Sequence, residues 1–160
     1  MNEEIHIGKL IQDKLREDGH AIAWLARKMN CDRTNVYKIF RKLSIDSARL
    51  LQISLILDYD FFVYYSTYIT THRKVSPFLL SVNDPINKEI HIGKLIRDKL
   101  REDGHAVAWL ARKMNCDRRN IYRISRKPSI DTTLLLQISL ILNYDFFVHY
   151  SVNITKYRKV

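Results

Sequence analysis

The chain has 160 residues and a formal net charge of +10, and 46% of its residues are apolar. This apolar content excludes wholesale disorder, and only four Gly and three Pro argue against collagen-like or many-turned all-β folds. No stretch reaches the roughly 18 apolar residues of a membrane span, and the acidic start predicts no secretory signal. Two cysteines build neither a disulfide framework nor a four-ligand zinc site. We therefore expect a cytoplasmic protein whose basic balance favours nucleic acid or an anionic surface as its partner.

An internal repeat organises the chain. Residues 4–75 return as residues 89–160 without a gap, and the two copies differ at 16 of their 72 positions. The segment 76–88 carries two prolines and is expected to be a linker. Two copies are too few for a solenoid, so we predict tandem domains at 1–75 and 89–160. The net charge is +4 for the first copy and +7 for the second.

Apolar spacing predicts five helices in each copy. In the first copy they are expected at about 7–17, 21–29, 33–42, 47–57 and 61–65. Gly19 should end the first helix, and Asn30 tolerates the left-handed conformation that a sharp turn before the third helix needs. Asp32 is expected to cap the third helix, and Ser44 or Asp46 to cap the fourth.

The end of each copy is rich in Thr, Ile and Tyr. We expect residues 67–75 and 152–160 to form a strand or a frayed extension. No βαβ pattern and no glycine-rich phosphate loop is present, so the predicted fold class is all-α.

Two helices joined by a three-residue turn, with a basic outer face on the second, follow the helix-turn-helix plan. The segment 24–39 resembles the lambda-repressor/Cro-like (XRE-type) helix-turn-helix of bacterial and phage regulators. It carries the Leu25-Ala26 pair of that family and, ten positions after the Ala, the branched apolar Val36, followed by Ile39. The resemblance covers about 5–65 and 90–150, and it implies two tandem five-helix lambda-repressor-like domains.

The resemblance also implies sequence-specific binding of double-stranded DNA by a transcriptional regulator. Helices 33–42 and 118–127 would then be recognition helices in the major groove. The base-reading candidates are Arg33, Thr34, Tyr37, Lys38, Arg41, Arg118, Arg119, Tyr122, Arg123 and Arg126. Candidates for phosphate contacts, which position the protein without specifying sequence, are Lys14, Arg16, Arg27, Lys28, Lys42, Lys99, Arg101, Arg112, Lys113 and Lys127. The alternative is that these are ordinary solvated charges.

The two copies differ most along the third helix. Five of the 11 positions in 33–43 change between the copies, against two of the 29 positions in 4–32. This pattern indicates two similar scaffolds with altered base-reading surfaces. Drift at exposed sites is the alternative.

An aromatic cluster at 59–65 carries more apolar surface than one 72-residue domain can bury. Half of it should complete the core. We expect the rest, including Tyr64 and its counterpart His149, to join the two domains as an intrachain pseudo-dimer. The alternatives are two independent domains on a flexible linker, or base stacking on the exposed rings.

No nucleophile–base pairing is evident, so we predict no enzyme, no cofactor, no small-molecule substrate and no membrane partner. His6, His20 and Cys31 suggest a metal site, but Cys31 lies in the turn, where a packed thiol is expected; we predict no metal. The alternatives to DNA binding are a protein-interaction or antitoxin-like module of the same fold, and RNA binding.

Overall fold

The structure, a computed structural model, describes residues 4–73 and 89–158. The predicted linker 76–88 lies outside these residues. Over the described part the chain is all-α, as expected, with ten helices. The helices are α1 (Ile7–Glu17), α2 (Ile22–Lys28), α3 (Arg33–Phe40), α4 (Ser47–Leu57), α5 (Val63–Arg73), α6 (Ile92–Glu102), α7 (Val107–Lys113), α8 (Arg118–Ser125), α9 (Thr132–Leu142) and α10 (Val148–Arg158).

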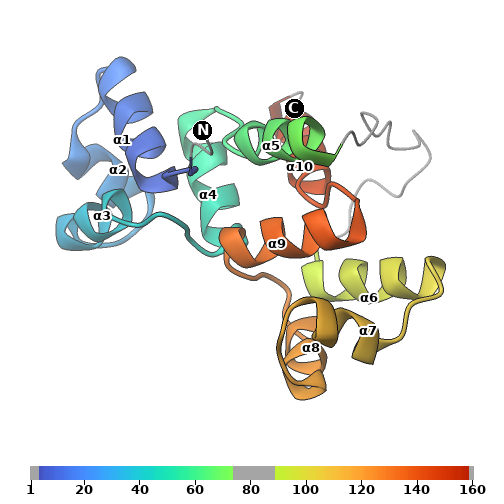
Figure 1. The fold of residues 1–160 in the computed structure, drawn as a ribbon. Helices are drawn as coiled ribbons and strands as arrows, with labels where there is room; N and C mark the ends of the chain where they lie inside the picture. The colour runs from blue at the N-terminus through green and yellow to red at the C-terminus, as the bar shows by residue number, and fades with distance from the viewer. Residues whose placement is uncertain (1–3, 74–88, 159–160) are drawn as a thin grey trace.

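The helices form three groups (Figure 1). The first outer group, α1–α3, lies at one end, and the second outer group, α6–α8, lies at the other. The central layer between them consists of α4, α5, α9 and α10. None of the helices in 4–73 and 89–158 is both long and apolar enough to serve as a membrane span.

The short connections adopt the conformations that their residues favour. Gly19 has a φ of 73° directly after α1, and Asn30 has a φ of 55° in the α2–α3 turn, which confirms both expectations. Asp46 is the N-cap of α4, where its carboxylate accepts a hydrogen bond from the Ala48 amide. Asp32 occupies the N-cap position of α3, but its side chain accepts no capping hydrogen bond. Its stabilising effect on α3 is therefore limited to its charge at the positive end of the helix.

The start of α1 is held against the end of α3. The amides of Ile7 and Gly8, which have no partner within α1, donate to the carbonyls of Leu43 and Lys42 at 3.1 and 3.0 Å. A Cβ at Gly8 would lie 2.3 Å from the Ile39 carbonyl oxygen, so only glycine allows this approach. The helix α3 ends at Phe40, where the Arg41 and Lys42 amides donate to carbonyls three residues earlier, those of Lys38 and Ile39. The expected extent 33–42 was two residues too long.

The second outer group repeats this arrangement. Ile92 and Gly93 donate to the carbonyls of Pro128 and Lys127. The helix α8 ends at Ser125, two residues before the end expected for 118–127.

The prediction of strands or frayed extensions at 67–75 and 152–160 was wrong for the described residues. Residues 63–73 and 148–158 form the continuous helices α5 and α10. Tyr65 and Ile69 are buried one helical turn apart, so packing of this face outweighs the β propensity of the segment. The Thr70 and Thr71 hydroxyls donate to the backbone carbonyls four residues earlier, which accommodates threonine within a helix.

The central layer is built from contacts between the repeats. Helix α5 packs against α9, and α10 packs against α4. The Phe62 ring stacks on the Tyr150 ring with centroids 4.5 Å apart, and the Phe147 ring stacks on the Tyr65 ring at the same distance. All four rings are almost completely buried.

Backbone hydrogen bonds join the segments that precede α4 and α9. The Ser47 amide donates to the Ile130 carbonyl at 2.8 Å, and the Thr132 amide donates to the Ile45 carbonyl at 2.8 Å. The two bonds connect equivalent residues with the repeats exchanged. Such a reciprocal pair is what a local twofold axis produces.

Two buried hydroxyl pairs follow the same rule. The Tyr65 hydroxyl donates to Thr132 Oγ1 at 3.0 Å, and the Tyr150 hydroxyl donates to Ser47 Oγ at 2.7 Å. Burial raises the pKa of each of these tyrosines to about 12, although the hydrogen bonds act in the opposite direction. These four hydroxyls are therefore paired across the repeats.

Candidate nucleic-acid interface

One side of α3 is fixed in the core of the first outer group. Val36 and Ile39 are buried, as is Phe40, and they belong to the same apolar cluster as Leu25 and Ala26 of α2, the helix against which α3 packs. The small Ala26 side chain permits the close approach of the two helices. The orientation of α3 is thus set by packing, and its other side is left to solvent.

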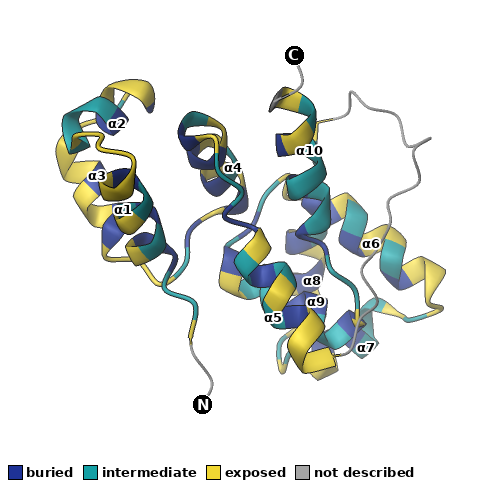
Figure 2. Ribbon diagram, turned by 90° about the horizontal axis from the view of Figure 1, so that it is seen from above, coloured by how far each residue is buried: buried dark blue, intermediate teal, exposed yellow. Residues whose placement is uncertain are grey.

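The exposed side of α3 carries the residues predicted to read bases. Arg33, Thr34, Tyr37, Lys38 and Arg41 are all exposed, and Tyr37 retains 47% of its accessible surface. Figure 2 shows the buried and exposed sides of this helix as dark blue and yellow. Their counterparts on the second outer group, Arg118, Arg119, Tyr122, Arg123 and Arg126, are exposed as well.

In the second repeat these side chains form an open hollow of about 540 Å³. It is lined by Arg119, Tyr122 and Arg123, which share one face of α8, and by Arg126 and Lys127, which directly follow the helix. The structure therefore groups Lys127, a predicted phosphate contact, with four of the predicted base-reading residues. Arg118 does not line the hollow.

The tyrosine at the centre of each face has a different neighbour in the two repeats. The Tyr37 ring meets the buried Phe40 ring edge-on, with centroids 6.3 Å apart. In the second repeat Ser125 replaces this Phe, and its hydroxyl donates to the Tyr122 carbonyl at 2.8 Å. Tyr122 is slightly more exposed than Tyr37, at 52%.

The outer face of α2 carries an aromatic stack that sequence analysis missed. The His20 ring lies parallel to the Trp24 ring at 3.7 Å, and Lys28 Nζ lies 5.8 Å from the centre of the Trp24 ring. The second repeat has the same stack from His105 to Trp109 and Lys113. The spacing of four residues between these side chains was the signal that could have revealed it.

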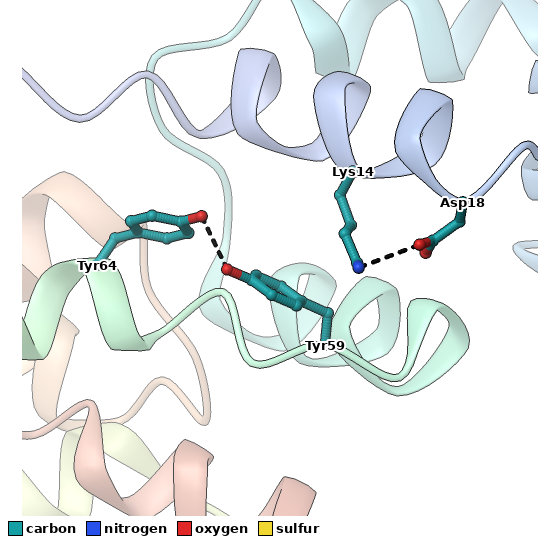
Figure 3. Close-up of polar contacts among 4 residues, drawn as sticks. All are labelled: Lys14, Asp18, Tyr59 and Tyr64. Carbon is teal, nitrogen blue, oxygen red and sulfur yellow. Dashed lines mark hydrogen bonds and ion pairs between the residues drawn. The ribbon is translucent and has the colours of Figure 1, made fainter.

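Two predicted phosphate contacts, Lys14 and Lys99, are engaged inside their own repeats. Lys14 Nζ lies 3.0 Å from the Asp18 carboxylate and 4.9 Å from the centre of the Tyr59 ring, as Figure 3 shows. The hydrogen bond that Lys14 donates to Asp18 raises the pKa of Lys14 above its ordinary value. Lys99 makes the equivalent contacts. These lysines tie α1 and α6 to the central layer and are not part of the exposed faces of α3 and α8.

The expectation that Tyr64 and His149 form the contact between the repeats is not supported by their hydrogen bonds. The Tyr64 hydroxyl lies 2.8 Å from the Tyr59 hydroxyl (Figure 3), and His149 Nε2 lies 2.9 Å from the Tyr144 hydroxyl. Both partners belong to the same repeat as the residue itself. The buried rings at Phe62 and its equivalents make the contact between repeats instead.

The remaining phosphate candidates are exposed. They are Arg16, Arg27, Lys28, Lys42, Arg101, Arg112, Lys113 and Lys127. The histidines considered for a metal site have other roles, because His6 accepts a hydrogen bond from the Lys9 amide at the start of α1 and His20 stacks on Trp24. Within the described ranges, no three His, Cys, Asp or Glu side chains are grouped so that they could hold a metal ion.

Comparison with known proteins gave no relative: no family model matches the chain, and no curated protein or solved structure matches it.

Proposed function

We propose that the chain is a sequence-specific double-stranded DNA-binding protein and acts as a cytoplasmic transcriptional regulator. In this proposal each repeat is one five-helix helix-turn-helix domain of the lambda-repressor/Cro-like kind. The helices α3 and α8 enter the major groove, and the exposed basic residues around them contact phosphates.

The observation that carries this proposal is the division of α3 and α8 into two sides. One side is anchored by buried apolar residues, Val36 and Ile39 in α3. The other side presents arginine, lysine and tyrosine to solvent without any neighbouring element covering them. A rigidly held helix with an exposed cationic face is suited to the groove of an anionic duplex.

The proposal includes an intrachain pseudo-dimer. The reciprocal contacts of α5 with α9 and of α10 with α4 support it, as do the stacked rings of Phe62 with Tyr150 and of Tyr65 with Phe147. Such packing lets one chain offer two recognition helices to two half-sites, the task that single-domain proteins of this kind perform by dimerising.

Selection of bound duplexes from a random library, followed by titration of the selected duplex at 50 and 200 mM salt, tests the proposal. We expect a loss of affinity on the order of a thousandfold between these concentrations, because two domains together neutralise several phosphates. Arg123→Ala should weaken binding about ten- to a hundredfold. Arg49→Ala is the matched control, since Arg49 is an exposed arginine on α4 outside the proposed interface.

An affinity for the duplex that does not change between 50 and 200 mM salt would show that DNA is not the main partner. Equal losses from Arg123→Ala and Arg49→Ala would remove α8 from the interface. Stronger competition by single strands or RNA hairpins than by the duplex would favour RNA as the ligand.

A further inference from the structure

The exposed faces of α3 and α8 differ in chemistry at two positions. The hollow on α8 includes Arg119 and Arg123, and the equivalent positions on α3 are Thr34 and Lys38. The tyrosine, the arginine one turn further on and the lysine after it are the same in both repeats. The two faces therefore share these three residues and differ in two neighbouring side chains one helical turn apart.

Packing does not account for these two differences. Thr34 and Lys38 are exposed, as are Arg119 and Arg123, so neither repeat needs its own pair to complete a core. Two buried anchors of each helix are equivalent in kind, Val36 with Ile39 in α3 and Ile121 with Ile124 in α8, and the third anchor of α3, Phe40, is Ser125 in α8. The substitutions change the surface while the helix position is kept.

Arginine has a recognition chemistry that threonine lacks and that lysine offers only in a less rigid form. Its guanidinium donates two parallel hydrogen bonds to O6 and N7 of guanine. Lysine offers a single point charge without this planar geometry, and threonine contacts either an acceptor or a thymine methyl group. A face with arginine at both positions consequently favours guanine more strongly than a face with Thr and Lys, above all under Arg119, where the other repeat has Thr34.

The relation between the two faces follows from the central contacts. Asp46 pairs in antiparallel fashion with Asp131, its own equivalent, and the Phe62 ring lies 6.2 Å from that of its equivalent, Phe147. A residue meets its own equivalent only near a twofold axis. An axis of this kind in the central layer relates α4 and α5 to α9 and α10.

The outer groups are attached to the central layer in the same way in both repeats. Lys14 lies 4.9 Å from the Tyr59 ring, and Lys99 lies 5.0 Å from the Tyr144 ring. Because α1 is bonded to the end of α3 through Gly8 and Lys42, and α6 to the end of α8 through Gly93 and Lys127, the same axis relates α3 to α8. Two faces related by a twofold axis read inverted half-sites, whereas beads on a flexible tether could also read a direct repeat.

We propose that the chain reads an imperfect inverted repeat, with guanines in the half-site under α8 that the half-site under α3 lacks. This inference rests on the proposed DNA binding and adds the orientation of the half-sites and the residues that make them unequal, Arg119 and Arg123 opposite Thr34 and Lys38. The ligand is a duplex with one guanine-containing half.

Duplex selection with three full-length proteins tests the inference. The wild-type chain should enrich inverted half-sites of unequal sequence. Arg119→Thr with Arg123→Lys should make the halves alike and remove a roughly ten- to a hundredfold preference for guanine at the affected positions. Thr34→Arg with Lys38→Arg should make the halves alike in the opposite sense, with guanines in both.

Arg97→Gln is the matched control. It also replaces an exposed arginine of the second repeat by its counterpart from the first, but it lies on α6. Sites enriched by this variant should stay unequal. Halves that are equal for the wild-type chain, guanines retained after the double change on α8, or half-sites in direct orientation would overturn the inference while leaving DNA binding intact. Failure to enrich any duplex would overturn the proposed function, and this inference with it.

Discussion

The outer groups and the central layer are held together in different ways. In the outer group α1–α3, the hydrogen bonds and apolar contacts that fix the helices come from one repeat, as where the Gly8 amide meets the Lys42 carbonyl. In the central layer, the stacked rings and paired hydroxyls join one repeat to the other, as Phe62 joins Tyr150. The same 72-residue sequence thus supplies both a self-contained unit and half of a shared one.

This difference separates the positions at which the two repeats must agree from those at which they can diverge. A change in the central layer alters a surface that must match its counterpart in the other repeat. A change on the exposed side of α3 or α8 alters one repeat alone. Four measurements test whether the central layer and the outer groups respond to change in these different ways.

The largest effect is expected from Phe62→Ala. This ring is fully buried against Tyr150, and its removal leaves a cavity that should lower the free energy of unfolding by about 3–5 kcal/mol. Denaturant unfolding gives the total, and amide hydrogen exchange should show the loss of protection first in α4, α5, α9 and α10. Val63→Ala, at a position with 44% exposure, is the control. Loss of protection confined to α1–α3 would show that Phe62 stabilises the outer group and not the central layer.

The second largest effect is expected from alkaline pH, which should lower the free energy of unfolding through the tyrosines of the central layer. Burial raises the pKa of Tyr65 and of Tyr150 to about 12, from an ordinary value of 10. The folded state then binds more protons than the unfolded state above pH 10, so stability is full below that pH and falls as pH rises toward 12. We expect a loss of about 2 kcal/mol for each tyrosine at pH 11.5.

Denaturant unfolding between pH 9 and 11.5 measures this slope. The double change Tyr65→Phe with Tyr150→Phe should flatten it, and Tyr37→Phe, at an exposed position on α3, should not. An unchanged slope in the double variant would show that other groups cause the alkaline loss.

Gly8→Ala should damage one outer group selectively. The added Cβ would lie 2.3 Å from the Ile39 carbonyl, so α1 must shift from α3 at a cost of about 1–3 kcal/mol. Hydrogen exchange should report faster opening in α1–α3 than in α6–α8, and Gly93→Ala should give the mirror result. Lys9→Ala, exposed on the same helix, is the control. Equal opening of both outer groups would mean that they are not independent.

The smallest effect is expected from Asp145→Asn in the central layer. Burial raises the pKa of the Asp145 carboxyl, against a hydrogen bond from Ser66 of the other repeat. The folded state therefore disfavours the carboxylate at neutral pH, and this cost disappears as pH falls toward the ordinary value of 3.8. The amide should raise stability at pH 7 by less than about 1 kcal/mol, seen as a higher denaturation midpoint that no longer rises on acidification. Asp13→Asn, exposed on α1, should not do so.

Much of each repeat follows from its sequence. The apolar period placed α1 to α4 within one or two residues, and Gly19 and Asn30 marked turns because they accept positive φ. The exposed face of α3 could also be predicted from the sequence, since Val36 and Ile39 must point inward and Tyr37 and Lys38 then point outward.

The rest depended on contacts that no local pattern contains. Residues 67–73 have β-leaning composition, and they are helical because Ile69 is buried in the shared layer. Tyr64 and His149 were expected at the repeat contact because the aromatic segment exceeds what one domain can bury, but sequence alone could not show that each has a partner in its own repeat. The grouping of Lys127 with Arg126 similarly required the backbone path after α8.

The hydrogen bonds that join the segments before α4 and α9 also bear on how the chain reaches its fold. They link residues 83 to 87 positions apart. The outer groups can therefore form early from local contacts, whereas the central layer forms only when the chain between the two repeats has closed into a long loop. Before the central layer forms, each repeat exposes an apolar surface that can pack against the complementary repeat of the same chain or of another copy. Covalent connection gives the correct partner an effective concentration on the order of millimolar. Refolding in dilute solution should therefore return single chains, and refolding of concentrated protein should yield chains exchanged in pairs.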